Sequence, residues 1–102
     1  MPPDRFAAEL VEGVEQRSEE IDALLGAHAI GWSVGRMPAV DRAVLRVATW
    51  ELLARADTPT GVVISEAVDL VKAYSTDESG RFVNGVLSAV AGAVRGGSNS
   101  ST

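Results

Sequence analysis

Cysteine is absent from this sequence, and aromatic residues make up only 5% of its 102 positions. The lack of cysteine excludes disulfides, thiolate chemistry and the usual zinc frameworks, and it favours a reducing compartment. No apolar stretch approaches the roughly 20 residues that a membrane span needs, and the N-terminus has neither the basic start nor the apolar run of a signal peptide. We therefore expect a soluble, cytoplasmic protein.

Residue patterns that carry catalysis are missing as well. The sequence has no nucleophile and base pair, no metal-ligand cluster and no glycine-rich loop that follows a strand. The single histidine, His28, lies near the end of a predicted helix, where a helix-terminal or solvent role is expected. We predict a protein that is not an enzyme and that needs no metal or cofactor.

Positive charge is also scarce, because nine basic residues face fourteen acidic ones and the formal net charge is −5. The average field of such a chain repels phosphate. A nucleic-acid site would therefore have to be a small local patch, or it would have to depend on a positively charged partner.

Hydrophobic residues make up 46% of the chain, and they recur at helical spacing. The first predicted helix covers residues 4–28, where the apolar stripe is interrupted once, at Arg17. The second covers residues 38–55 and is apolar on most sides, which is typical of a central helix; its polar residues, Asp41 and Thr49 among them, are expected to face outward.

Two further helices complete the prediction. Thr58 followed by Pro59 matches the N-cap and first position of a helix that continues to about Tyr74. The run from Ser75 to Glu78 matches a capping box that opens the last helix. The sequence thus predicts an all-α bundle of about four helices over residues 1–95, followed by a disordered tail over residues 96–102.

Two stretches carry more information than a helical pattern. Residues 37–53 have the sequence MPAVDRAVLRVATWELL, and residues 64–87 contain the strings ISEAVDLVK and RFVNGVL. Their order and spacing resemble the C-terminal portion of the NusB family of transcription antitermination proteins. The resemblance covers roughly residues 6–91.

The resemblance implies a function. NusB proteins are helical, bind the ribosomal protein NusE and the boxA element of nascent RNA, and so help RNA polymerase to read through terminators in ribosomal RNA operons. By position in the family motifs, Glu78, Arg81 and Phe82 would approach RNA. Val40, Asp41 and Val44 match the region that the family offers to NusE.

Each of these residues also has a structural interpretation. Phe82 can be a core residue beside a solvated Arg81, and Glu78 can belong to the capping box. Asp41 can be an acid in the first turn of a helix, where the helix dipole favours it. For Asn84 and Gly85, which are poor helix formers, we expect a side-chain hydrogen bond and a close helix contact respectively.

Relative to the family pattern, the Arg-rich N-terminal helices are missing. We expect a truncated sequence or a reduced relative that binds RNA weakly on its own, since each lost phosphate contact removes a counterion-release contribution. The apolar stripe of the first helix would be left open, which favours a homodimer. Two other hypotheses remain: an accessory-domain fragment of a ribosomal RNA cytosine methyltransferase, and a protein-binding scaffold without RNA binding.

Overall fold

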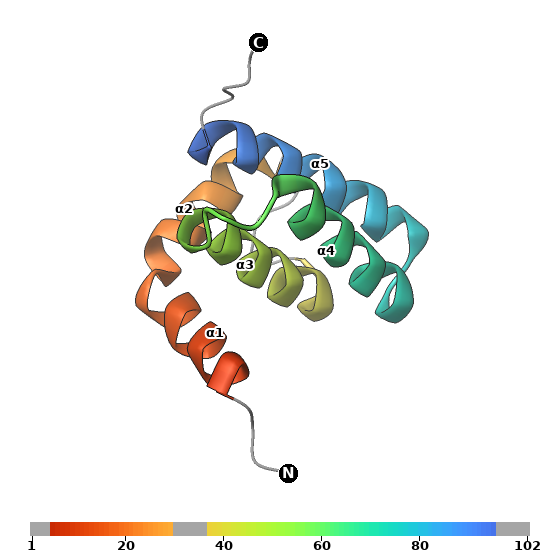
Figure 1. Cartoon of the computed structure of the whole chain (residues 1–102). Coiled ribbons are helices and arrows are strands. Elements are labelled where there is room, and N and C mark those ends of the chain that lie inside the picture. The colour runs from red at the N-terminus through yellow and green to blue at the C-terminus, as the bar shows by residue number, and fades with distance from the viewer. Residues whose placement is uncertain (1–4, 30–36, 96–102) are drawn as a thin grey trace.

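This computed structural model describes residues 5–29 and 37–95 of the chain. Most of these residues lie in helices. No strand occurs in these two ranges, so the all-α prediction is confirmed. The helices are α1 (Arg5–Gln16), α2 (Ser18–His28), α3 (Ala39–Ala54), α4 (Thr60–Tyr74) and α5 (Asp77–Val94) (Figure 1). The predicted tail at residues 96–102 lies outside the described ranges. None of the described helices is long and apolar enough to cross a membrane.

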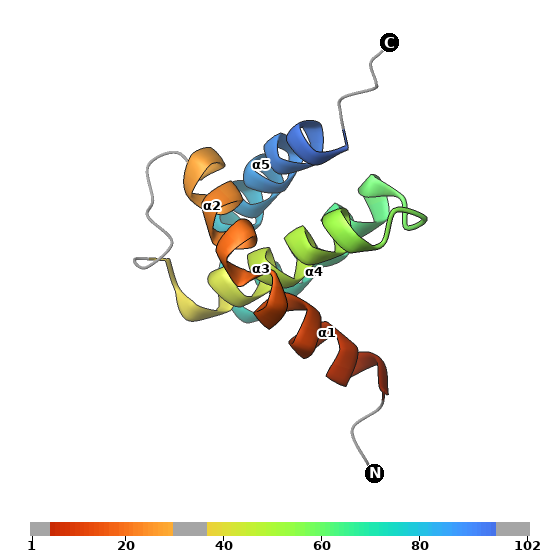
Figure 2. The ribbon, with the colours of Figure 1, turned by 90° about the vertical axis from the view of Figure 1, so that its left-hand side faces the viewer.

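The single helix predicted over residues 4–28 is instead two helices, α1 and α2. The described residues therefore form five helices where about four were expected. The chain bends at Arg17, whose φ of −112° and ψ of 20° lie outside the α-helical region. The Arg17 N–H still donates to the Gly13 carbonyl at 3.2 Å, and the Arg17 carbonyl accepts from the Ile21 N–H at 2.9 Å. The polar residue that interrupts the apolar stripe is therefore where the axis turns, and the N-terminal end of α1 leads away from the bundle (Figure 2).

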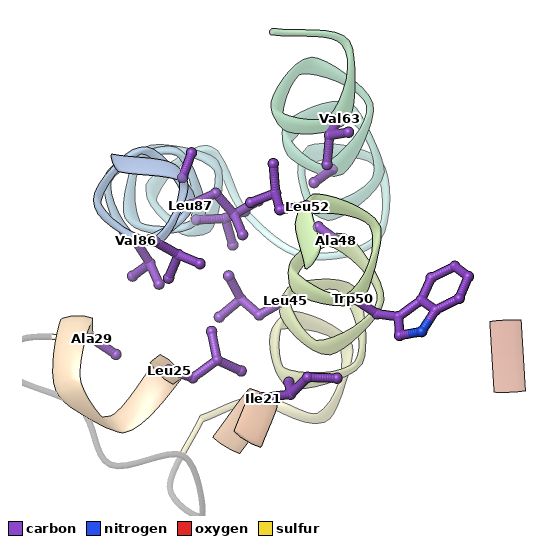
Figure 3. Packing of buried hydrophobic residues seen from close by; sticks show 14 of the residues in the cluster. Ile21, Leu25, Ala29, Leu45, Ala48, Trp50, Leu52, Val63, Val86 and Leu87 are labelled. Atoms are coloured by element: carbon purple, nitrogen blue, oxygen red, sulfur yellow. The ribbon is translucent and has the colours of Figure 1, made fainter. Parts of the chain in front are cut away.

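Helix α3 is central, as predicted, because it packs against each of the other four described helices. Leu45 and Leu52 of α3 lie inside the core, facing Leu25 of α2 and Leu87 of α5 (Figure 3). The outward orientation expected for Asp41 and Thr49 is wrong, because both are buried. They stand four residues on either side of Leu45, so they share its inward face.

A close contact between a glycine and an aromatic ring helps to hold α1 against α3. Gly13 of α1 lies directly against the Trp50 indole, so that a Cβ at this position would overlap the ring. The indole points from α3 toward α1 and away from the Leu45 side of the core (Figure 3). The Arg55 guanidinium lies 5.1 Å from the centre of the same ring. Trp50 is thus a packing aromatic, and it joins α1 to the bundle.

The helix starts differ by one residue from those predicted. Pro59, not Thr58, is the N-cap of α4. The capping box from Ser75 to Glu78 is not formed, because Thr76 is the N-cap of α5 and its Oγ1 accepts from the Ser79 N–H at 2.9 Å. Thr76 has an extended backbone, φ −134° and ψ 164°, which places its hydroxyl over the first helical turn.

Arg95 is the C-cap residue of α5, and its side chain binds the C-terminal end of α3. Its guanidinium donates to the carbonyls of Leu52 at 3.1 Å, Thr58 at 2.7 Å and Arg55 at 2.9 Å. It also reaches the Thr60 hydroxyl at 3.0 Å. Carbonyls at the end of a helix lack intrahelical partners, and a cation there is favoured by the helix dipole. One side chain therefore satisfies the end of α3 and the turn that follows it.

Candidate nucleic-acid and protein interface

A hollow of about 330 Å³ lies where α3 and α5 begin. Pro38 is the N-cap of α3 and Thr76 is the N-cap of α5, and both line this hollow. Helix N-termini carry partial positive charge, which favours negative groups nearby. The hollow brings together members of both predicted sites; its lining consists of Pro38, Asp41, Ser75, Thr76, Glu78, Ser79 and Phe82.

Asp41 is the most unusual group in the hollow. It is only 2% exposed, and its Oδ1 has no hydrogen-bond partner within the described residues. A buried polar atom without a partner costs about 1–3 kcal/mol, and more when it is charged. Asp41 Oδ1 is therefore a buried acceptor that the described residues leave without a donor.

Phe82 and Glu78 lie on the same hollow with different environments. The Phe82 ring is half-buried: it packs against the core, as the structural interpretation expects, and it also lines the hollow. Glu78 is exposed in the first turn of α5, where its charge complements the helix dipole. Glu78 therefore does not belong to the expected capping box; it is an acidic residue of the first helical turn.

Arg81 is exposed and lies beyond the residues that line the hollow. A second basic residue, Lys72, lies near the start of α5 and was not among the predicted site residues. The Lys72 side chain crosses Gly80, where a Cβ would lie 2.7 Å from the Lys72 Cγ. The glycine in the first turns of α5 was the signal that α4 approaches closely here. Neither Lys72 nor Arg81 forms an ion pair within the described part of the chain.

The residues predicted to bind a partner protein divide between two places. Asp41 enters the hollow, while Val44 lines a separate apolar groove between α3 and α4. Val40 is exposed one helical turn before Val44. Asp41 therefore lines a different pocket from Val44, while Val40 and Val44 follow each other along α3.

The expectation of a close helix contact at Gly85 is wrong. Gly85 is exposed, and a Cβ built there would meet nothing within 4 Å. Asn84 is also exposed.

No group of His, Cys, Asp or Glu residues that could hold a metal ion occurs in the described ranges. What the described residues do offer is a hollow rich in acceptors, an aromatic edge, two exposed basic side chains and an apolar groove. Such features serve binding, and the fold and the site together define a helical docking module.

The family follows from comparison with known proteins. The model of the NusB family matches residues 2–92, and the chain belongs to this family. It is 50% identical over 96 residues to the transcription antitermination protein NusB of Clavibacter sepedonicus, covering 89% of this chain and 70% of that protein. It is 58% identical over 92 residues to the NusB protein of Saccharopolyspora erythraea, covering 89% and 62% respectively.

Solved structures agree with the sequence relatives. A structure of T. maritima NusB superimposes with a TM-score of 0.79 at 41% identity, over 86% of this chain and 65% of that one. A structure titled as antitermination factors NusB and NusE in complex with dsRNA gives a TM-score of 0.78 at 39% identity, over 86% and 64%. The chain thus spans about two thirds of the length of its relatives. The names of these relatives are those of transcription factors, so the prediction of a protein that is not an enzyme is confirmed.

Proposed function

We propose that this chain is the docking part of a NusB antitermination factor, which binds a NusE protein and the boxA RNA of ribosomal RNA operons and acts on RNA polymerase indirectly. The observation that carries the proposal is the meeting of Asp41, Glu78 and Phe82 in one hollow. The likeness to the complex of NusB and NusE with dsRNA supports both partners. Its work on nascent transcripts would place it in the cytoplasm.

On the RNA side, Phe82 supplies an aromatic edge on which an unpaired base can stack, and Arg81 supplies a charge for phosphate. Glu78 lines the same hollow as Phe82 and lowers the affinity by repelling phosphate. On the protein side, Val40 and Val44 supply apolar contacts beside Asp41, whose buried Oδ1 the described residues leave without a donor. The RNA and NusE would then meet at the start of α3 and α5.

Gel shifts with boxA RNA, with and without NusE and across a range of salt, test this proposal. We expect weak binding by the chain alone and tighter binding with NusE, because the net charge of −5 opposes phosphate. Arg81→Gln should lower the salt slope by about 0.7, the single-strand value for one phosphate contact. Phe82→Leu should weaken binding without changing the slope.

The outcomes separate the alternatives. NusE binding without RNA binding would favour the protein scaffold, and absence of both would contradict the proposal. The methyltransferase accessory domain is not favoured, since the relatives are named antitermination proteins.

A homodimer also stays a proposal. It is supported by Val11 on α1, which is 58% exposed. A single monomeric species in light scattering at micromolar concentration would exclude the dimer.

A further inference from the structure

An apolar groove of about 210 Å³ runs between α3 and α4, on a side of α3 that the hollow does not use. Its walls are small and aliphatic, and two acids lie among them; the lining residues are Ala43, Val44, Val47, Ala48, Glu51, Val63, Glu66, Ala67 and Leu70. Leu70 is 49% exposed at its edge. Of the exposed large hydrophobic residues of α4, which are Val62, Leu70 and Tyr74, only Leu70 lines this groove, so it marks an apolar surface available for contact.

The two acids give the groove a charge pattern. Glu51 of α3 and Glu66 of α4 lie close enough to repel each other across it. Burial raises the pKa of the Glu51 carboxyl above its ordinary value, the nearby Glu66 raises it further, and Arg55 partly offsets both effects. This paired negative charge beside an apolar trough is complementary to a side chain or segment that joins an aliphatic group to a cation.

We infer that the α3–α4 groove receives an aliphatic side chain of the partner protein, with a lysine or arginine of the same segment placed between Glu51 and Glu66. This inference rests on the proposed function, because the partner is the NusE-type protein of that proposal. Val44 links the groove to the exposed Val40, so the protein interface continues from the start of α3 along its length. A cation between the two carboxylates would relieve their repulsion, which an uncharged apolar partner could not do.

RNA is excluded as the occupant by the same features. Phosphate would be repelled by the two carboxylates, and the groove has aliphatic walls without an aromatic ring on which a base could stack. The basic residues Lys72 and Arg81 lie elsewhere, where α4 approaches the start of α5.

The test measures NusE binding by calorimetry on the full 102-residue chain and on two pairs of matched variants. Leu70→Ala removes the open leucine at the groove, and Val62→Ala removes a valine of the same helix that is 44% exposed but does not line the groove. Glu66→Gln neutralises a lining acid, and Asp69→Asn neutralises an exposed acid of α4 outside the groove. Circular dichroism confirms that each variant is folded.

We expect Leu70→Ala to weaken NusE binding about tenfold or more and Val62→Ala to leave it within about twofold, since buried interface residues dominate affinity. Glu66→Gln should weaken binding and reduce its salt dependence, while Asp69→Asn should not. Equal binding by Leu70→Ala, Glu66→Gln and the wild type would overturn the inference and leave the proposed function intact. Absence of NusE binding by the wild-type chain would overturn both.

Discussion

Arg46 of α3 holds Asp22 of α2 through two parallel hydrogen bonds, from Nε to Oδ1 at 2.9 Å and from Nη2 to Oδ2 at 2.8 Å. The bonds join residues 24 positions apart, so they fix α2 against the central helix. The hydrogen bond to Asp22 raises the pKa of Arg46 beyond its ordinary value. A bidentate pair between a guanidinium and a carboxylate is stronger than a single contact between the same charges.

This geometry predicts a measurable coupling between the two residues. A double-mutant cycle with Arg46→Gln and Asp22→Asn, followed by urea unfolding, should give about 0.5–1 kcal/mol, because both side chains are about one third exposed and solvent screens them. The matched control is the exposed pair of Arg17 and Glu20, which has one hydrogen bond at 3.0 Å within a helical turn. That pair should couple by less than about 0.5 kcal/mol. Equal coupling in the two cycles would contradict the role assigned to the bidentate geometry.

The Arg95 guanidinium should contribute more to the free energy of unfolding than an exposed surface charge does. Arg95→Ala removes a donor from the Leu52 and Arg55 carbonyls at the end of α3, although the Arg55 carbonyl keeps its bond from the Thr58 N–H, and we expect a loss of about 2–3 kcal/mol in the free energy of unfolding. Arg95→Lys keeps the charge but loses the planar fork, so it should recover only part of the loss. Full recovery by lysine would show that charge alone matters.

Two glycines with close neighbours should respond differently to alanine. Gly13→Ala collides with the rigid Trp50 indole, so it should destabilise the protein by about 1–3 kcal/mol and change tryptophan fluorescence. Gly80→Ala meets the flexible Lys72 side chain, which can move aside, so a smaller effect is expected. Gly85→Ala meets open space and should stabilise α5 by about 0.5–1 kcal/mol. Thermal unfolding of the three variants checks the order of their stabilities. If Gly85→Ala destabilised the protein, a Cβ at this position could not lie in open space.

Glu51 should make stability depend on pH. Because its pKa is raised in the folded protein, the folded state holds the proton more tightly than the unfolded chain does. The stability linked to this group is therefore present at low pH and is lost as the pH rises from the ordinary carboxyl value of 4.5 through the raised one. Relative to the wild type, Glu51→Gln should gain stability between pH 4 and pH 7, by less than about 1 kcal/mol given its partial exposure. Denaturant unfolding at several pH values measures this difference, and a gain that is independent of pH would argue against the titration of Glu51.

Periodicity predicted the helices well, because apolar spacing is a local property of the sequence. The central position of α3 followed from its apolar circumference, and its bounds at Ala39 and Ala54 lie within one residue of the prediction. The division at Arg17 was visible only as one polar residue in a stripe, since a bend depends on what Gly13 and Ile21 contact in space.

The site was harder to predict than the fold. The family motifs pointed to Asp41 and Phe82 separately, but their meeting in one hollow depends on how α3 and α5 pack. The burial of Asp41 contradicts the general tendency of acids to face solvent, and a single sequence carries no local signal for it. The α3–α4 groove was likewise unpredictable, because Glu51 and Glu66 belong to different helices.

The bonds made by Arg95 also bear on how fast the molecule opens. They connect positions 35 to 44 residues apart, so they can form only after α3, α4 and α5 have assembled. Interactions that form after the folding transition state slow unfolding and leave the refolding rate nearly unchanged. The guanidinium would then act as a kinetic latch, lengthening the lifetime of the native bundle without helping to nucleate it.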